Sequence, residues 1–401
     1  MKRIREAEDH DLLNGWKQIA AHLKCSEKTA HRWAKTSDLP ILKPVSRSKK
    51  PPVFASKRAL NAWLKCGIEH ALLTDTQLIA LDKQAHILWS HEFPNPLRNC
   101  NADELEWRLR IVDLDGSGER GVLFAARFLT QNNPDTLFYF SPTGELEWQL
   151  EAEPSLRDRT GQPFDRAWTY THVITVTEAK GATVWAAMAN LAGWAGCVLR
   201  IDADGSPVVQ FANAGYVERL CALPLAGGNF LIACGENNDY DDAFVALLGT
   251  HDPPACSVPG ERLVYRFANA PHGQPRKYIL FPKTELVLAR SWPYGAATRI
   301  VEHADGVIVE VQTAEDPAHF RYHFSEDLEP RYVFPSGNHE FAHGVFEKRG
   351  AISHAWLECP ELQAPLVLRI WEPDSGWYER PIPWRDNPWK ELAGRHEQEQ
   401  R

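Results

Sequence analysis

The chain has 401 residues, of which 44% are hydrophobic, including 15 Trp and 17 Phe. This length exceeds the usual size of a single hydrophobic core, and this composition excludes disorder over most of the chain, so we expect a multidomain globular protein. No stretch is apolar over the ~18 residues of a membrane span, no signal-peptide pattern opens the chain, and the eight Cys contain no CxxC pair, which favours a cytoplasmic protein with reduced thiols and no membrane partner.

Charge is distributed unevenly along the chain. The formal net charge is −9, yet residues 1–66 carry 15 Lys and Arg against 6 Asp and Glu. The remainder carries 29 basic and 47 acidic residues. Because binding to nucleic-acid phosphates needs clustered Lys and Arg, we expect a basic DNA-binding head at 1–66. An acidic body at 71–390 and a polar tail at 391–401 would follow it.

Two short helices are predicted in the head. Apolar residues at helical spacing predict the first helix over 16–23. Ser26 is a good N-cap for the second helix, whose inner face contains Ala30 and Trp33. Lys24 occupies the turn between them, where such turns often carry Gly. This is the layout of a helix-turn-helix, although a helical hairpin with a solvated charged face has the same pattern.

The segment after the second helix completes the predicted head. Residues 39–56 read as a two-stranded wing with a cationic tip, and Ser56 can cap a third helix. With GWKQIAAHL, CSEKTAHRW and VFASKRALNAWL in this order, the head resembles the winged helix-turn-helix domains of the MerR and excisionase type. The resemblance implies binding to double-stranded DNA, and so small a head calls for a homodimer on a two-part site. The predicted DNA-binding residues are Lys28, Thr29, His31, Arg32, Lys35, Lys43, Arg47, Lys49 and Lys50.

The body repeats a hairpin-like unit in which an apolar strand, a turn and an aromatic strand follow one another. The units are LIALDKQAHILWSHEF, LFYFSPTGELEWQLEAE, VLRIDADGSPVVQFANAG, RLVYRFANAP, RYHFSEDLEPRYVFPSG and LVLRIWEPDSGWYERP. Trp89 and Trp148 lie 59 positions apart, and Phe93 and Phe211 lie twice as far apart. This spacing predicts an all-β propeller of about six blades, with five or seven also fitting, in which the C-terminal strands pair with the first hairpin. The units resemble the outer hairpins of quinoprotein-like or integrin-type propellers, which implies the architecture alone.

Three motifs in the body resemble metal-binding sequences. DLDGSGERG places Asp113, Asp115 and Ser117 as a calcium loop does but lacks a closing carboxylate, so an Asx-type turn is the favoured alternative to a weak calcium site. HEFAH at 339–343 has the HExxH spelling of zinc peptidases, yet the surrounding Pro and Gly favour a hairpin over the helix that this chemistry needs. GENNDYDD at 235–242 fits a cation site or a solvated loop, and the loop is favoured.

These motifs contain no convincing catalytic constellation, so an enzyme is not expected, and no cofactor other than calcium is indicated. FDRAWTYTH at 164–172 fits either a ligand mouth or inner-strand packing. The favoured function is a bacterial transcriptional regulator that binds specific DNA sequences and whose propeller binds a small molecule or a protein. The alternative is a propeller enzyme, or a carbohydrate- or protein-binding platform, whose head is only an interaction module.

Overall fold

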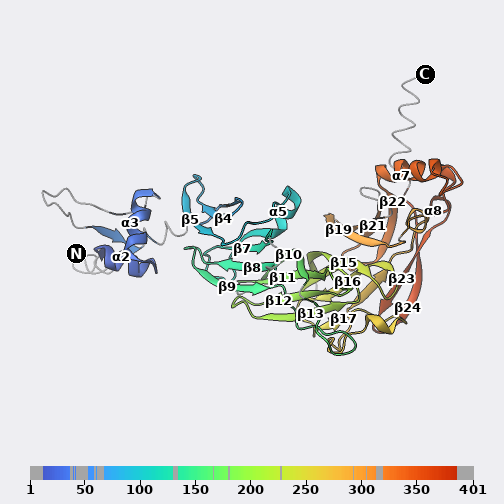
Figure 1. Ribbon diagram of the computed structural model, residues 1–401, viewed down its shortest axis with the longest axis horizontal. Coiled ribbons are helices and arrows are strands. Elements are labelled where there is room, and N and C mark those ends of the chain that lie inside the picture. The colour runs from blue at the N-terminus through green and yellow to red at the C-terminus, as the bar shows by residue number, and fades with distance from the viewer. Residues whose placement is uncertain are drawn as a thin grey trace, which may run out of the picture. The chain divides into compact units, whose positions relative to one another are not determined.

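The structure is a computed structural model of the chain. It describes residues 12–36, 39, 41, 53–57, 60, 67–129, 134–165, 167–178, 181–225, 228–291, 293–303, 305–312 and 319–385. The chain divides into two compact units, whose ribbons are shown in Figure 1. Unit 1 contains Met1–Glu151, Thr177–Thr183 and Ala203–Gly205. Unit 2 contains Ala152–Val176, Val184–Asp202 and Ser206–Arg401.

The N-terminal part of unit 1 consists of two helices and a small sheet. Helices α2 (Trp16–His22) and α3 (Glu27–Thr36) follow each other, as the sequence predicts. Strand β1 (Leu12–Asn14) pairs antiparallel with β2 (Phe54–Ser56). Their shared core is made of Leu13, Ile19, Ala20, Leu23, Ala30, Trp33, Leu39, Val53, Ala55 and Leu60.

Two antiparallel sheets complete unit 1. The first consists of β3 (His70–Leu73), β4 (Gln77–Leu81) and β5 (Ile87–Glu92). The second consists of β6 (Leu109–Val112), β7 (Gly121–Ala126), β8 (Thr136–Phe140) and β9 (Leu146–Glu151), preceded by helix α5 (Ala102–Arg108).

Three sheets form most of unit 2. The first has the order β10 (Trp168–Glu178), β11 (Gly181–Asn190), β12 (Gly196–Ile201), β13 (Pro207–Asn213) and β17 (Ala255–Cys256), and the tip of its β10–β11 hairpin belongs to unit 1. The second has the order β14 (Val217–Leu225), β15 (Gly228–Asn237), β16 (Asp242–Gly249), β18 (Lys277–Leu280), β23 (Leu366–Glu372) and β24 (Gly376–Ile382). The third has the order β19 (Ala296–His303), β20 (Gly306–Gln312), β21 (His319–Phe324) and β22 (Pro330–Pro335).

Short helices occupy the connections of unit 2. They are η1 (Leu263–Tyr265), α6 (Glu285–Leu288), α7 (Gly337–Lys348), η2 (Trp356–Glu358) and α8 (Pro360–Gln363). None of the helices in the described ranges is both long and apolar enough to cross a membrane.

The mostly β body is confirmed, but one predicted pairing is wrong. The C-terminal strands β23 and β24 join β18 in the six-stranded sheet, with Ile279 opposite Ile370, and not the first hairpin of the body. Strand β18 is buried along its whole length, so pairing with β23 satisfies backbone groups that would otherwise lie in the core. The described residues of the body form five sheets of three to six strands, and the number of propeller blades stays a prediction.

The hairpin predicted around HEFAH is also wrong, because these residues lie in helix α7. The helix begins after Ser336, so that Pro335 precedes it and breaks none of its hydrogen bonds. Glu340 in the first turn and Lys348 in the last turn complement the helix dipole. Gly344 is the one glycine well inside the helix, a cost of about 1 kcal/mol that tertiary packing can offset.

Two indole rings on strands of unit 1 each contact the turn of a later hairpin. The Trp89 ring lies against the β8–β9 turn, where its Nε1 donates to the Pro142 carbonyl at 3.2 Å. Trp148 repeats the arrangement with the Ala203 carbonyl at 3.1 Å. A glycine with positive φ lies under each ring, Gly144 under Trp89 and Gly205 under Trp148. The 59-residue spacing of the two Trp therefore reflects a repeated contact.

A buried hydrogen-bond network joins three strands of unit 2. Asn213 on β13 donates through Nδ2 to the carbonyls of Gly215 and Glu236, each at 2.8 Å. Its Oδ1 accepts from the Tyr278 hydroxyl at 3.0 Å, and this hydroxyl accepts from Asn237 at 2.7 Å. Asn213, Asn237 and Tyr278 are fully buried, so each bond replaces one that water would otherwise make.

Replacing Gly144 tests the indole contact. A Cβ at this position would lie 2.6 Å from Trp89 Cγ, whereas a Cβ at Gly118, which has almost the same φ, meets nothing within 4 Å. Both Gly→Ala variants incur the left-handed backbone penalty, but only Gly144→Ala displaces the ring. We expect it to destabilise unit 1 by about 1 to 3 kcal/mol more than Gly118→Ala, the usual cost of overpacking. Calorimetric melting of both variants measures this difference, and equal melting temperatures would contradict the contact.

Candidate functional site

Helix α3 begins at a capped turn. Lys24 has a φ of 51°, in the left-handed region that usually favours glycine, so the departure noted in the sequence is accommodated by the backbone. Ser26 Oγ accepts from the Thr29 amide at 3.1 Å, which confirms the predicted N-cap. The turn thereby sets the direction in which α3 leaves α2.

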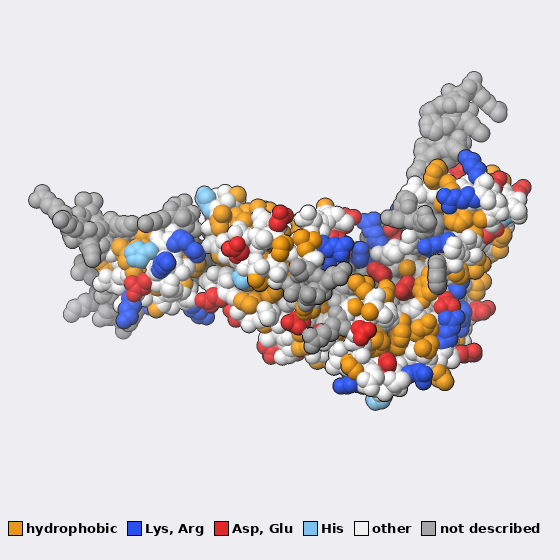
Figure 2. All heavy atoms as spheres, viewed as in Figure 1, with side chains coloured by type: hydrophobic (Ala, Val, Ile, Leu, Met, Phe, Trp, Pro, Cys, Tyr) orange, Lys and Arg blue, Asp and Glu red, His pale blue; other side chains and the backbone are white. Residues whose placement is uncertain are grey.

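The two faces of α3 have different chemistry. Ala30 and Trp33 are buried in the core shared with α2, while Lys28, His31 and Arg32 are exposed. The buried pair anchors the helix in the core of the head. The opposite, exposed face is polar and cationic. Figure 2 shows Lys and Arg side chains among the exposed groups of this segment, at the left of the view.

Two of the predicted contact residues take part in the fold of the head. The His31 ring stacks on Trp16, with ring centroids 3.9 Å apart, so it packs on α2 while remaining exposed. The Thr29 hydroxyl lies 2.9 Å from Ser26 Oγ, and the residue is half-buried. Lys28 and Arg32 are the other predicted contact residues of α3 whose side chains are described, and both are exposed.

The remaining predicted contacts with DNA fall where the structure gives no side-chain description. Lys35 belongs to α3, but its side chain is outside the described part. The wing residues and most of the predicted third helix lie outside the described residues, and the wing contacts stay predictions: Lys43, Arg47, Lys49 and Lys50.

The oxygens of the predicted calcium loop hold the loop itself together. The Asp113 carboxylate accepts from the amides of Gly116 and Gly118 at 2.9 and 2.8 Å. Asp115 accepts from the Ser117 amide at 3.0 Å, and the Ser117 hydroxyl accepts from the next-but-one amide at 3.2 Å. These are the contacts of an Asx-type turn, and calcium binding stays a prediction.

The acidic segment 235–242 is not the solvated loop that we favoured. Asp239 is buried, and its carboxylate accepts from the amides of Gly260 and Arg262 at 2.6 and 2.7 Å. The Arg266 guanidinium lies 3.5 Å from the same carboxylate. Asp239 therefore organises the loop that follows β17.

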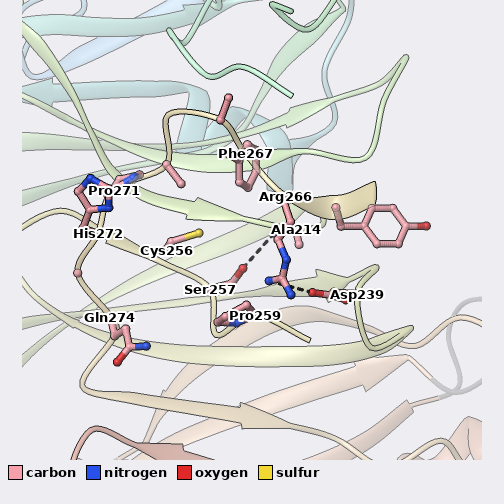
Figure 3. A pocket seen from close by; sticks show the side chains of 14 residues that line it. Ala214, Asp239, Cys256, Ser257, Pro259, Arg266, Phe267, Pro271, His272 and Gln274 are labelled. Atoms are coloured by element: carbon pink, nitrogen blue, oxygen red, sulfur yellow. Dashed lines mark hydrogen bonds and ion pairs between the residues drawn. The ribbon is translucent and has the colours of Figure 1, made fainter. Parts of the chain in front are cut away.

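This loop forms a pocket of about 450 Å³ in unit 2. Figure 3 shows Arg266 pointing toward Asp239, with Phe267 and His272 on the wall. The hairpin-like unit predicted at RLVYRFANAP is wrong, because Leu263–Tyr265 form the short helix η1 and the Arg262 amide donates to Asp239 instead of to a paired strand. The Pro- and Gly-rich run SVPGERLVYRFANAPHGQP is a loop signal that would have indicated the pocket.

Aromatic rings support one side of the pocket. Phe267 lies 4.9 Å from Trp194 and 6.0 Å from Phe164 between ring centroids. Phe164 belongs to FDRAWTYTH, whose Trp168 and Tyr170 are buried on β10. FDRAWTYTH was interpreted either as a ligand mouth or as inner-strand packing. Its first residue, Phe164, supports the pocket, whereas Trp168 and Tyr170 pack in the sheet.

The Asp239 carboxylate is already engaged by two loop amides and Arg266, so the pocket offers a ligand mainly the outer side of the Arg266 guanidinium, His272 and apolar walls. Cys256 also lines it, but burial raises the pKa of this thiol to about 11. The thiol is then protonated at neutral pH and is a poor nucleophile. The pocket is therefore better suited to binding than to covalent catalysis.

Two carboxyl groups beside the turn of the β15–β16 hairpin have raised pKa values. Burial, followed by the nearby Glu218 charge, raises the pKa of Glu236 to about 7. Burial raises the pKa of Asp242 to about 6, against the lowering effect of Lys283. Both groups lie at the ends of the β15–β16 hairpin and hold a proton more strongly than exposed carboxyls do.

No protein-family model matches the chain, and a search of curated proteins finds no match. Three solved structures that resemble the chain share 8 to 10% identity with it. A europium-containing methanol dehydrogenase has 10% identity and a TM-score of 0.35, over 68% of this chain and 63% of its own, so the chain spans less than two thirds of that protein. BBS1N in complex with ARL6DN has 8% identity and a TM-score of 0.30, over 79% and 88% of the two chains. The Dos1 propeller has 9% identity and a TM-score of 0.31, over 74% and 85%. Similarities this weak do not decide the arrangement of the sheets or the function.

Glu236→Gln tests the buried carboxyl. The folded protein holds this proton up to about pH 7, whereas the unfolded chain loses it near the ordinary pKa of 4.5, so the wild-type protein loses stability as the pH rises between these values. The variant carries no ionisable group at this position. We therefore expect the free energy of unfolding of unit 2 to fall by about 1 to 3 kcal/mol less between pH 5 and pH 8 in the variant than in the wild-type protein.

Denaturant unfolding at pH 5 and pH 8 measures this effect. Glu379→Gln, at an exposed position on β24, is the control and should keep the wild-type dependence. Identical pH dependence in the Glu236→Gln and wild-type proteins would show that the Glu236 carboxyl is not perturbed.

Proposed function

We propose that the protein is a transcriptional regulator that binds double-stranded DNA through helix α3, which enters the major groove. The head would then be a winged helix-turn-helix of the MerR and excisionase type, acting as a homodimer. The body would be a β-propeller that binds a small molecule or a protein.

The exposed face of α3 carries this proposal. Lys28 and Arg32 extend from one side of a helix whose other side is anchored by Ala30 and Trp33. Lys and Arg reach guanine acceptors and phosphates, and a helix fixed on one face can hold its outer face against a groove. The +9 formal charge of residues 1–66 supports an electrostatic contribution, since DNA binding releases counterions in proportion to the phosphates contacted.

The second candidate function is a ligand-binding platform whose head contacts a protein. The pocket beside Arg266 and Asp239 favours it, because it combines a volume of about 450 Å³ with polar and aromatic walls. The two candidates differ in whether the outer face of α3 matters for binding to a duplex.

Charge reversal of α3 separates these candidates. The full-length Lys28→Glu/Arg32→Glu variant should bind a pool of random-sequence duplexes about 100-fold or more weakly than the wild-type protein, since each lost contact is worth about 1 to 3 kcal/mol. Wild-type affinity should fall roughly 100-fold between 50 and 200 mM salt, as expected for a few phosphate contacts. Fluorescence anisotropy of labelled duplexes measures both effects.

A matched control corrects for net charge. Lys83→Glu/Arg98→Glu makes the same charge change at exposed positions of the body and should bind DNA within about threefold of wild type, because neither residue belongs to the face of α3 that is proposed to contact DNA. Equal melting temperatures would show that both variants fold. If wild-type protein does not bind duplex DNA, or if both variants bind as it does, the DNA-binding proposal is wrong.

A further inference from the structure

Four side chains that ligate transition metals meet in the helical part of unit 2. They are Glu285, His343, His354 and Cys359. Glu285 begins α6, His343 is on α7, His354 follows α7, and Cys359 lies between η2 and α8. Helices α7 and α8 appear together near the C-terminal end of the ribbon in Figure 1.

The distances among these side chains are those of a compact ligand set. The Nε2 atoms of His343 and His354 are 3.4 Å apart, and His354 Nε2 is 3.0 Å from Glu285 Oε2. Cys359 Sγ is 3.9 Å from the same Glu285 oxygen. One ligand atom from each of the four residues lies within 4.8 Å of the other three.

Tetrahedral zinc matches this arrangement in geometry and in ligand type. Bonds of about 2.0 Å to nitrogen and oxygen and about 2.3 Å to one sulfur place tetrahedral ligand atoms about 3.3 to 3.5 Å apart. A thiolate, two imidazoles and a carboxylate are all zinc ligands, and four protein ligands are typical of structural sites. We propose that Glu285, His343, His354 and Cys359 bind one Zn²⁺ ion that stabilises the helical part of unit 2.

Burial supports a ligand role for the two central groups. His343 is fully buried and Cys359 is 1% exposed, while Glu285 and His354 are half-buried. His343 Nε2 lies 3.4 Å from His354 Nε2, and this long contact between two imidazole nitrogens does not by itself account for burying the His343 ring. Coordination through Nε2 gives it an energetic reason to be buried.

The small apolar core around the cluster explains why a metal would be useful. Leu286 and Ile352 are its buried members, with Ala289, Ala342 and Phe346 packed against them. Two buried side chains stabilise little structure, and small helical elements with so little core commonly depend on a metal or a disulfide. A metal joining α6, α7 and the segment before α8 would replace the missing apolar contacts.

Charge and proton balance are consistent with a divalent ion. Cys359 Sγ lies 2.7 Å from the Glu361 carboxylate, which is placed to accept the thiol proton. On binding, the S–H bond would break, the proton would pass through Glu361 to solvent, and the sulfur would form a bond to zinc as thiolate. Thiolate and the Glu285 carboxylate carry two negative charges, which Zn²⁺ neutralises.

The HExxH motif provides only one of these ligands. His339 packs against Phe320 and Trp356, with ring centroids 4.3 and 5.0 Å away, and is not part of the cluster. Glu340 is exposed. The proposed site is thus a four-ligand structural site and not the open site of a zinc peptidase.

A second group of metal-ligating side chains, His303, Asp305 and His323, is less suitable. The Arg331 guanidinium forms an ion pair with the Asp305 carboxylate and supplies the positive charge that a metal would bring. The Glu285 cluster has no Lys or Arg ion pair among the described contacts, which distinguishes the two groups.

Metal binding by tag-free, full-length protein tests the proposal. After removal of metal with a chelator, Zn²⁺ should bind at one ion per chain and raise the melting temperature. Co²⁺ in its place should give the visible bands of a tetrahedral site and a thiolate-to-cobalt charge-transfer band. Cys359→Ser should lose that band, and Cys359→Ser and His354→Gln should each weaken Zn²⁺ binding more than about 100-fold, since loss of even an outer partner costs about 10- to 100-fold.

Cys256→Ser is the matched control, because it removes a free Cys of the same unit away from the cluster and should bind like wild type. If a ligand variant fails to fold, the Co²⁺ spectrum of the wild-type protein still tests the site, because it reports tetrahedral geometry and a thiolate ligand without any substitution. Substoichiometric binding by wild type, a Co²⁺ spectrum without the thiolate band, or equal binding by Cys359→Ser and Cys256→Ser would overturn the zinc site. None of these results depends on whether the head binds DNA.

Discussion

Buried polar groups need hydrogen-bond partners. In the loops and turns between the strands of this protein, side chains supply these partners to backbone amides and carbonyls. In unit 2, Asp239 accepts two loop amides that no strand reaches, and Asn213 accepts from and donates to groups on three segments. In unit 1, Trp89 and Trp148 donate to turn carbonyls of the following hairpins. The position of each loop therefore follows from a side chain on another element, because an unpaired group in the core would cost about 1 to 3 kcal/mol.

The parts of the fold that local chemistry determines could be predicted from the sequence. The Ser26 cap and the apolar spacing define α3 without reference to the rest of the chain, and the Trp repeat reveals a contact made once per hairpin. Helix α7 could not be recognised in the same way. Its glycines and the preceding Pro335 are poor helix signals, and it is held by contacts with α6, η2 and the β21–β22 hairpin. Tertiary packing here outweighs local preference.

The pocket and the metal-ligating cluster could not be predicted from the sequence, because their residues lie far apart along the chain. Asp239 meets Arg266 across 27 positions, and Glu285 meets Cys359 across 74. No motif of fixed spacing joins such residues, so they appear in a sequence as isolated acids, His and Cys. Of the two His in the HExxH spelling, only His343 lies in this cluster, whereas His339 packs against Phe320 and Trp356.

The proposed zinc ligands also have a topological consequence. Glu285 precedes strand β19, whereas the other three ligands follow strand β22, so the four-stranded sheet β19–β22 lies between them in the chain. A metal bound to both sides would close a loop of roughly 60 residues at the base of this sheet. Closing a loop this long removes considerable conformational freedom from the unfolded chain, and the loop contains a complete antiparallel sheet that gains from it. The metal would hold the segment before β19 next to the segment after β22. The small core of Leu286 and Ile352 would then only have to align the helices.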